Sequence, residues 1–181
     1  MGKIVRLSLC LLFSVCLALP AEGVKVVTIN AWSGLTYSGV LKVREYEDPD
    51  NRMYRRTLLG TGLAALAPDL VAVNEANLLP DYAYSLSAEL SLDQIHHVRV
   101  GGVRIGPVGL PVNLREGDVI LAHPRLSLVS IGSKQLSGWP VGNTFSFQAG
   151  DASQVVGGKI LVAGREVYVF TTRWHVSEFE R

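Results

Sequence analysis

Cysteine is scarce in this sequence, with only Cys10 and Cys16 among 181 residues. Both lie within the first 23 residues, which have the composition of a cleavable leader. From residue 24 onward the sequence therefore offers no disulfide, no thiolate nucleophile and no cysteine metal ligand. Any catalytic chemistry must come from other side chains.

An excess of charge is also missing, since the sequence has 17 basic and 16 acidic residues. Leaving out the first 23 residues removes Lys3, Arg6 and Glu22, and the remaining formal charges balance. Such a chain has no overall basic field to attract a polyanion, so binding of nucleic acid would require a local patch. We find no internal repeat or long linker, and the length suits one domain with its own core.

The N-terminal segment is typical of a secretory signal peptide. Lys3 and Arg6 precede an apolar run over Leu7–Leu19, and the mostly small residues of Pro20–Gly23 follow it. The run is short for a membrane span, although an uncleaved anchor is the alternative. We predict a signal peptide from residue 1 to about 23, cleaved after Ala21 or Gly23, a secreted or periplasmic protein, and a domain over residues 24–181.

Strand-like and helix-like patterns alternate in the first half of the chain. The predicted elements are a strand over Val24–Asn30, a helix capped by Asp50 or Asn51 and ended by Pro68, a strand over Leu70–Val73, and a helix over Pro80–Leu90. In the first helix Leu59, Leu63 and Leu66 fall at helical spacing on one face. Such β-α-β-α alternation indicates a layered α/β domain.

After Leu90 the pattern changes to short strands separated by Gly and Pro turns. The predicted strands are Gln94–Val100, Val119–Ala122, Leu126–Ile131, Thr144–Phe147, Gln154–Ala163 and Val167–Thr172. We expect them to form a largely antiparallel sheet section, which makes the fold class α/β (α+β).

The polar pair Asn74-Glu75 follows the apolar run Leu70–Val73 directly. Ligands of layered α/β proteins bind outside the carboxyl ends of strands, and a carboxylate oxygen there suits Mg²⁺, Mn²⁺ or Ca²⁺. Glu75 is therefore a candidate metal ligand. The alternative is a solvated carboxylate in a loop.

Asn30 ends the first predicted strand in the same way. Its amide could hold a phosphate oxygen or a metal-bound water, and the alternative is a turn residue without such a role. We expect Trp32 to be a packing wall rather than a substrate contact.

The last predicted strand leads to Arg173 and His175. His175 is a candidate acid/base or phosphate contact, because imidazole titrates near working pH. Arg173 is a candidate phosphate clamp. A solvated strand end is the alternative for both.

The other histidines are expected to be structural. His96 and His97 are neighbours on one strand, so their side chains should point to opposite faces and cannot share a metal without distortion. His123 precedes Pro124 at a strand exit.

Four segments together resemble the endonuclease/exonuclease/phosphatase superfamily. The segment Val26–Trp32 (VVTINAW) is similar to the family's opening strand with its catalytic Asn, and Leu66–Glu75 (LAPDLVAVNE) is similar to the segment ending in Gln-Glu. Gly117–Pro124 (GDVILAHP) and Phe170–His175 (FTTRWH) are weaker matches to a strand ending in Ser-Arg and to an Asn-Thr-His-Leu strand end.

The resemblance implies two packed sheets flanked by helices and a phosphoesterase that depends on a divalent cation, Mg²⁺ or alternatively Mn²⁺ or Ca²⁺. Glu75 would bind the metal, Asn30 would orient a phosphate oxygen or the metal's outer shell, and His175 or Arg173 would contact the phosphate. The substrate would be a lipid, a small diester or a nucleic acid. Secretion and neutral charge favour the first two, and no stable partner is expected.

Two departures from the family pattern qualify these expectations. Arg173 stands where the family has His, and His175 follows two residues later. The family's later Asp-x-Asn and Ser-Asp-His motifs have no counterpart in this sequence, so we expect only the N-terminal part of the domain, without its C-terminal strands and without turnover. The alternative hypothesis is a secreted binding module on the same scaffold that does not catalyse.

Overall fold

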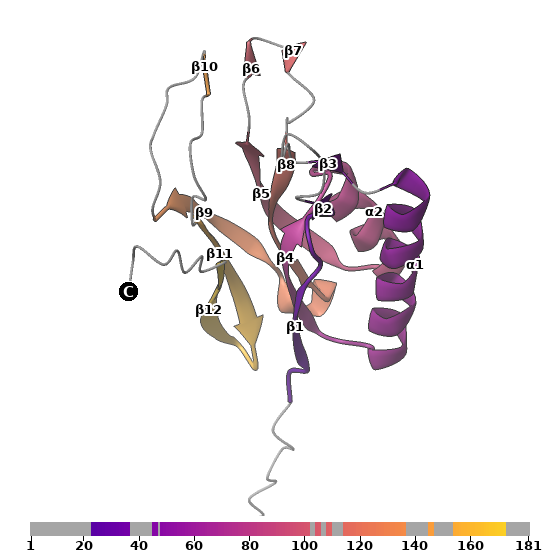
Figure 1. The fold of residues 1–181 in the computed structure, drawn as a ribbon. Helices are drawn as coiled ribbons and strands as arrows, with labels where there is room; N and C mark the ends of the chain where they lie inside the picture. Colours follow the sequence, from indigo (N-terminus) through magenta and orange to yellow (C-terminus); the bar gives the residue numbers. More distant parts are fainter. Residues whose placement is uncertain are drawn as a thin grey trace, which may run out of the picture.

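The computed structural model describes residues 23–36, 45–46, 48–101, 104–105, 108–109, 114–136, 145–146 and 154–172. Within them the chain forms two large packed β-sheets and two small sheets of two-residue strands, with two helices against the outer face of one large sheet (Figure 1). The predicted signal peptide, apart from Gly23, lies outside the described residues.

The first sheet has four strands in the order β1-β4-β8-β5. Their bounds are Val26–Asn30 for β1, Leu70–Ala76 for β4, Leu114–Ala122 for β8 and Asp93–Gly101 for β5. Strands β1 and β4 are parallel, with Asn30 opposite Asn74, whereas β8 runs antiparallel to both of its neighbours. The carboxyl ends of β1 and β4 therefore reach the same edge of the sheet.

The second sheet is antiparallel, in the order β12-β11-β9. Its strands are β9 (Val129–Gln135), β11 (Gln154–Val162) and β12 (Arg165–Thr172). Strand β12 packs over β4 and β8, and β11 packs over β8 and β5. The short elements are β2 (Leu35–Thr36), β3 (Glu45–Tyr46), β6 (Arg104–Ile105), β7 (Val108–Gly109), β10 (Phe145–Ser146) and the 3₁₀ turn η1 (Pro124–Leu126).

One hydrophobic core lies between the first sheet and the helices α1 (Pro49–Leu66) and α2 (Asp81–Leu90). Its buried side chains include Leu63, Val71, Val73, Leu79, Leu86, Val119 and Leu121. A second core, between the two sheets, comprises Leu70, Ile120, Ala122, Leu126, Val156 and Ile160. Because successive side chains of a strand point to opposite faces, β4 and β8 supply both cores, which explains their continuous apolar runs.

Two details of the sequence prediction are wrong. Helix α1 is capped by Asp48, whose side chain accepts a hydrogen bond from the Asp50 amide at 2.8 Å, because Pro49 suits the first helical position. The strand expected over Leu126–Ile131 begins only at Val129, after the 3₁₀ turn.

The fold class is confirmed, since helices cover one face of a two-sheet sandwich. The remaining long strands and both helices lie where the sequence predicts them, within a few residues at their ends, and the described strand β8 begins five residues earlier than expected, at Leu114. In the described part of the chain, no helix combines the length and the apolar character that a bilayer span needs.

Candidate cation site at the carboxyl ends of β1 and β4

The side chains of Asn30 and Glu75 meet where β1 and β4 end. Asn30 Nδ2 donates a hydrogen bond to Glu75 Oε1 at 2.5 Å, and the Ser33 amide donates to Glu75 Oε2 at 3.2 Å. Glu75 is half-buried and Asn30 is exposed. The structure thus brings together two predicted site residues that are 45 positions apart in the sequence.

The amide of Asn30 is held in one orientation. Its Oδ1 accepts a hydrogen bond from the Trp32 amide at 2.8 Å, so Nδ2 is left to face the carboxylate of Glu75. A flipped amide would set oxygen against oxygen at this short distance. Asn30 therefore orients Glu75, whereas the family resemblance implied that its amide would orient a phosphate oxygen or the outer shell of the metal.

A β-bulge places Glu75 at this edge. The register of β4 against β8 shifts between Val73 and Ala76, so Asn74 and Glu75 together stand opposite one residue, Asp118. Val73 and Ala76 are both fully buried in the core under the helices. Glu75, with a left-handed φ of 58°, is the inserted residue, and the bulge turns its side chain out of that core.

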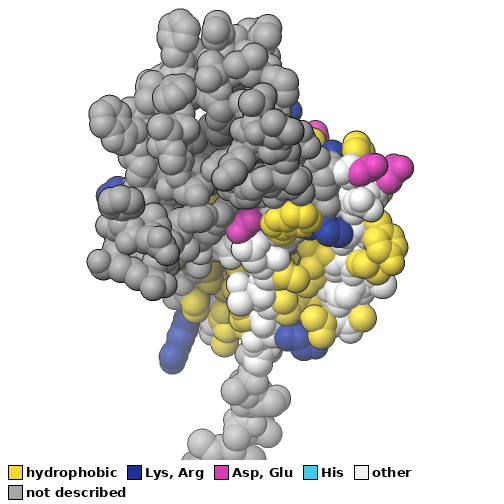
Figure 2. All heavy atoms as spheres, viewed as in Figure 1, with side chains coloured by type: hydrophobic (Ala, Val, Ile, Leu, Met, Phe, Trp, Pro, Cys, Tyr) yellow, Lys and Arg dark blue, Asp and Glu magenta, His cyan; other side chains and the backbone are white. Residues whose placement is uncertain are grey.

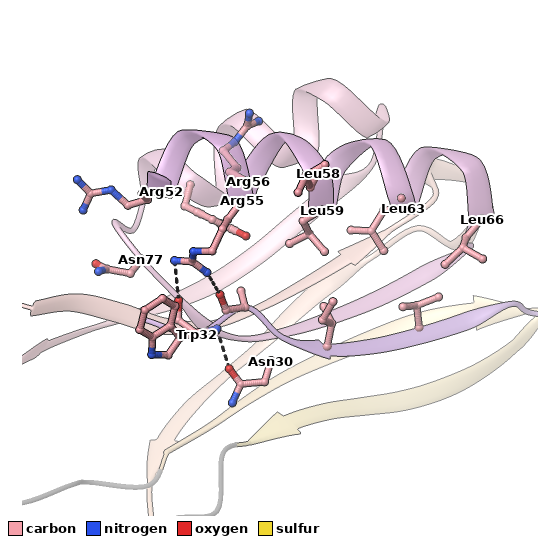
Figure 3. A pocket seen from close by; sticks show the side chains of 15 residues that line it. Asn30, Trp32, Arg52, Arg55, Arg56, Leu58, Leu59, Leu63, Leu66 and Asn77 are labelled. Atoms are coloured by element: carbon pink, nitrogen blue, oxygen red, sulfur yellow. Dashed lines mark hydrogen bonds between the residues drawn. The ribbon is translucent and has the colours of Figure 1, made fainter. Parts of the chain in front are cut away.

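The loop after β1 is fixed by helix α1. Arg55 donates to the carbonyl oxygens of Ala31, at 2.6 Å, and Trp32, at 3.3 Å, and its guanidinium carbon lies 4.6 Å from the centre of the Trp32 ring (Figure 3). Trp32 is 45% exposed, so it does not form the packing wall that we expected. The sequence gave no signal for this contact of Arg55 with the loop after β1.

A pocket of about 470 Å³ lies between β1 and α1. Figure 3 shows Leu58, Leu59 and Leu63 along the helix side of this pocket, while Asn30 points away from α1. Hydrophobic side chains gather on the surface between β1 and α1 in Figure 2. The pocket is mainly apolar, and Asn30 is among the residues that line it.

The histidines behave as structural residues where the structure describes them. His96 makes an edge-on contact with the ring of Tyr84 on α2, whereas His97 Nδ1 is 2.9 Å from Ser133 Oγ on β9. Their side chains therefore point to opposite faces, as predicted. Partial burial lowers the pKa of both rings, and the neighbouring His96 adds to the effect on the pKa of His97. His123 accepts from the Arg125 amide at 3.2 Å and caps η1.

Arg173 and His175 lie outside the described residues, so their predicted roles are untested. The strand that leads to them does end near the site, because the Thr171 hydroxyl oxygen accepts a hydrogen bond from Asn74 Nδ2 at 3.0 Å.

The carboxylate of Glu75 offers oxygen ligands of the kind that hard divalent cations prefer. No cluster of three or more His, Asp or Glu side chains that could hold a metal occurs among the residues that the structure describes. Mg²⁺ commonly takes only one or two carboxylates and keeps several waters. Oε1 of Glu75 accepts from Asn30 and Oε2 accepts from Ser33, and a carboxylate offers about four acceptor positions in all.

Comparison with known proteins identifies the fold. The sequence matches no family model and no curated protein. Its structure is similar over 85% of the chain, with a TM-score of 0.52 and 16% identity, to an endonuclease/exonuclease/phosphatase family protein from Leptotrichia buccalis C-1013-b. Over 87% of the chain it is similar to D. rerio TDP2, humanized by 14 mutations, with a TM-score of 0.51 and 14% identity.

The chain has the endonuclease/exonuclease/phosphatase fold. A functionally unknown conserved protein from Enterococcus faecalis V583 shares this fold over 83% of the chain, with a TM-score of 0.52 and 17% identity. The chain covers 56% of the Leptotrichia protein and 52% of each of the other two, which is about half of their length. The resemblance inferred from the four sequence segments is therefore confirmed for the fold.

Proposed function

We propose that Glu75 and Asn30 form the cation-binding part of a phosphoester-hydrolase site in a secreted protein. The observation that carries this proposal is the hydrogen bond between Asn30 Nδ2 and Glu75 Oε1, at 2.5 Å, across two parallel strand ends. It holds a carboxylate in a fixed orientation at the edge where layered α/β proteins bind ligands. The endonuclease/exonuclease/phosphatase fold of the chain supports the same class of reaction.

Each residue of the proposed site has its own role. Glu75 would hold the cation, which we propose to be Mg²⁺, with Mn²⁺ or Ca²⁺ as alternatives. When bound, the cation supplies positive charge that offsets the charge developing on phosphoryl oxygens. Asn30 keeps the carboxylate in place with one N–H, and its second N–H suits a phosphate oxygen or a water. Arg173 and His175, which follow β12, would contact the phosphate.

The substrate proposed is a phosphate ester. The balanced charge of the chain after residue 23 gives no general attraction for a polyanion, which favours a lipid headgroup or a small diester over nucleic acid. All three substrates share the phosphodiester group, so a generic chromogenic phosphodiester is a suitable first probe.

Cation binding is the first test. Titration of the purified full chain with Mn²⁺, followed by the electron paramagnetic resonance signal of the free ion, should show one site. Glu75→Gln keeps the size of the side chain and one of its two hydrogen-bonding oxygens but removes the charge, so we expect the site to weaken by about 10-fold or more. The matched control is Glu166→Gln, since Glu166 is an exposed carboxylate in an ion pair with Lys159. This control should bind Mn²⁺ as the wild type does.

Hydrolysis is the second test. Mg²⁺-dependent cleavage of the chromogenic phosphodiester that is lost in Glu75→Gln and kept in Glu166→Gln would support the enzyme and would contradict our sequence-based expectation of no turnover. Cation binding without cleavage would support the alternative, a binding module. Equal Mn²⁺ affinity of the wild type and Glu75→Gln would overturn the proposed site.

A further inference from the structure

The end of β4 is an irregular piece of backbone that requires support. A regular strand would direct Glu75 toward the helices, on the face of Val71 and Val73. The two-for-one bulge and the left-handed φ of 58° instead turn it to the sheet edge. A non-glycine residue in this conformation is strained and persists only where its surroundings hold it.

The support on the inner side comes from the preceding residue, Asn74. Its Nδ2 donates to Asp118 Oδ1 at 2.8 Å and to Thr171 Oγ1 at 3.0 Å. Asp118 is the single residue of β8 that stands opposite the bulge, and Thr171 belongs to β12 of the other sheet. One amide thus ties β4 to both its neighbour strand and the facing sheet.

Asp118 and Thr171 are buried, so their hydrogen bonds with Asn74 restrict the movement of its side chain. Asp118 is 2% exposed and Thr171 is 5% exposed. A carboxylate that is shielded from water needs hydrogen-bond donors in fixed places, and breaking such a bond leaves a buried polar atom that water cannot reach. The amide of Asn74 therefore has little freedom to move, and neither has the peptide that joins it to Glu75.

We propose that Asn74, Asp118 and Thr171 are positioning residues that lock the bulge of β4 and so fix the carboxylate of Glu75 for its cation. This inference rests on the proposed function of Glu75. Asn74 forms hydrogen bonds with residues buried between the sheets. Asn30 and Ser33 donate hydrogen bonds to Glu75 at the sheet edge. Removing a residue that orients a metal ligand typically lowers metal affinity by about 10- to 100-fold.

Two pairs of variants test the proposal in the full chain. Asn74→Leu removes the amide at similar size, and Asn74→Gln restores an amide. Thr171→Val removes a hydroxyl with little change in shape, and Thr171→Ser restores it. Thr171→Val leaves the Asn74–Asp118 bond in place, so it provides a readout even if Asn74→Leu fails to fold. We expect Mn²⁺ affinity to fall by about 10-fold or more in Asn74→Leu and by less in Thr171→Val, with recovery in Thr171→Ser.

Nuclear magnetic resonance of the cation-free protein gives a second readout. The side-chain amide protons of Asn30 report directly on its bond to Glu75. In Asn74→Leu and Thr171→Val these resonances should move toward the values of a free asparagine. A merely structural role of Asn74 would lower stability without moving them.

Asp69→Asn is the matched control, since Asp69 holds the opposite end of β4 through Lys25 and Arg125. We expect it to lower stability while Mn²⁺ affinity and the Asn30 resonances stay as in the wild type. If the wild type binds Mn²⁺ through Glu75 but Thr171→Val and a folded Asn74→Leu bind it equally well, the positioning role is overturned and the cation site stands. If Glu75→Gln binds as the wild type does, the cation site itself has failed.

Discussion

Single side chains secure the two ends of β4 in different ways. At the start of the strand, Asp69 Oδ2 accepts from the Lys25 amide at 2.8 Å and Asp69 Oδ1 pairs with Arg125 at 2.8 Å. At the other end, Asn74 and Glu75 make the contacts described above with both sheets. The contacts of Asp69 connect the residue before β1 and the turn η1 to the start of β4. The contacts of Asn74 and Glu75 hold the candidate site.

Asp69 gives the fold a dependence on pH. The hydrogen bond from the Lys25 amide, followed by that from Arg125, holds the pKa of this carboxyl below its ordinary value of 3.8. A depressed pKa stabilises the folded state above the unfolded pKa, and this contribution is lost as the pH falls through the folded pKa. Asp69→Asn should therefore lower the free energy of unfolding at neutral pH. We expect a loss of only about 1 kcal/mol, because the pair of Asp69 and Arg125 is partly exposed to solvent.

Urea unfolding of the wild type and Asp69→Asn at several pH values measures this effect. The difference in the free energy of unfolding should shrink as the pH falls below about 4, where the carboxyl of the unfolded chain protonates. A difference that stays constant between neutral pH and acid would show that Asp69 does not contribute through its charge.

The sequence predicted Asn30 and Glu75 as site candidates because each follows an apolar strand directly. It did not predict the contact between Asn74 and Asp118, which depends on a bulge that no local pattern marks. One signal was present in the sequence. Asp118 has the same strand parity as the buried Ile120 and Ala122, so it was bound to face the interior.

At the scale of elements, a glycine in α1 has room for a side chain, whereas a glycine in β8 has none. Gly62 lies in α1, where an added Cβ would meet nothing within 4 Å. A Cβ on Gly117 in β8 would overlap the backbone oxygen of His97 on the neighbouring strand. The same substitution therefore has two expected outcomes.

Gly62→Ala should raise the free energy of unfolding by about 0.5–1 kcal/mol, because alanine restricts the unfolded chain and favours the helix. Gly117→Ala should lower it by about 1–3 kcal/mol or more, because two strands must separate. Chemical denaturation of both variants beside the wild type measures the two values. A stable Gly117→Ala would mean that β5 and β8 are not packed as closely as described.

Element boundaries set by a local proline were predicted at Pro68 but missed at Pro49 and Pro124. Pro68 correctly marked the end of α1, and the turn at Pro124 delayed β9 beyond its expected start. The two-residue strands, such as β2 and β3, carry no periodicity of their own and exist only because their partners pair with them.

At the scale of the whole molecule, the sandwich follows from strands that are apolar on both faces. Residues of β4 and β8 alternate between the core under the helices and the core between the sheets. This arrangement could be inferred from the sequence, whereas the pairing order of the strands could not, since it depends on contacts between distant segments.

Secretion is a prediction at the same scale. Val24 packs at the margin of the core between the sheets, and the Lys25 amide binds Asp69. Cleavage after Ala21 or Gly23 would leave both contacts intact. Mass spectrometry of the protein recovered from the medium or periplasm of a secreting host should find Glu22 or Val24 as the first residue. A cell-associated protein that still begins at Met1 would contradict the signal peptide.

The most direct test of the central claim is the position of a bound cation. Crystals of the full chain soaked in Mn²⁺ should give an anomalous peak at about 2.1 Å from a carboxylate oxygen of Glu75. Crystals of Glu75→Gln treated in the same way should lack this peak. A peak that is equally strong in both crystals, or Mn²⁺ bound only at a place remote from Glu75 and Asn30, would contradict the account.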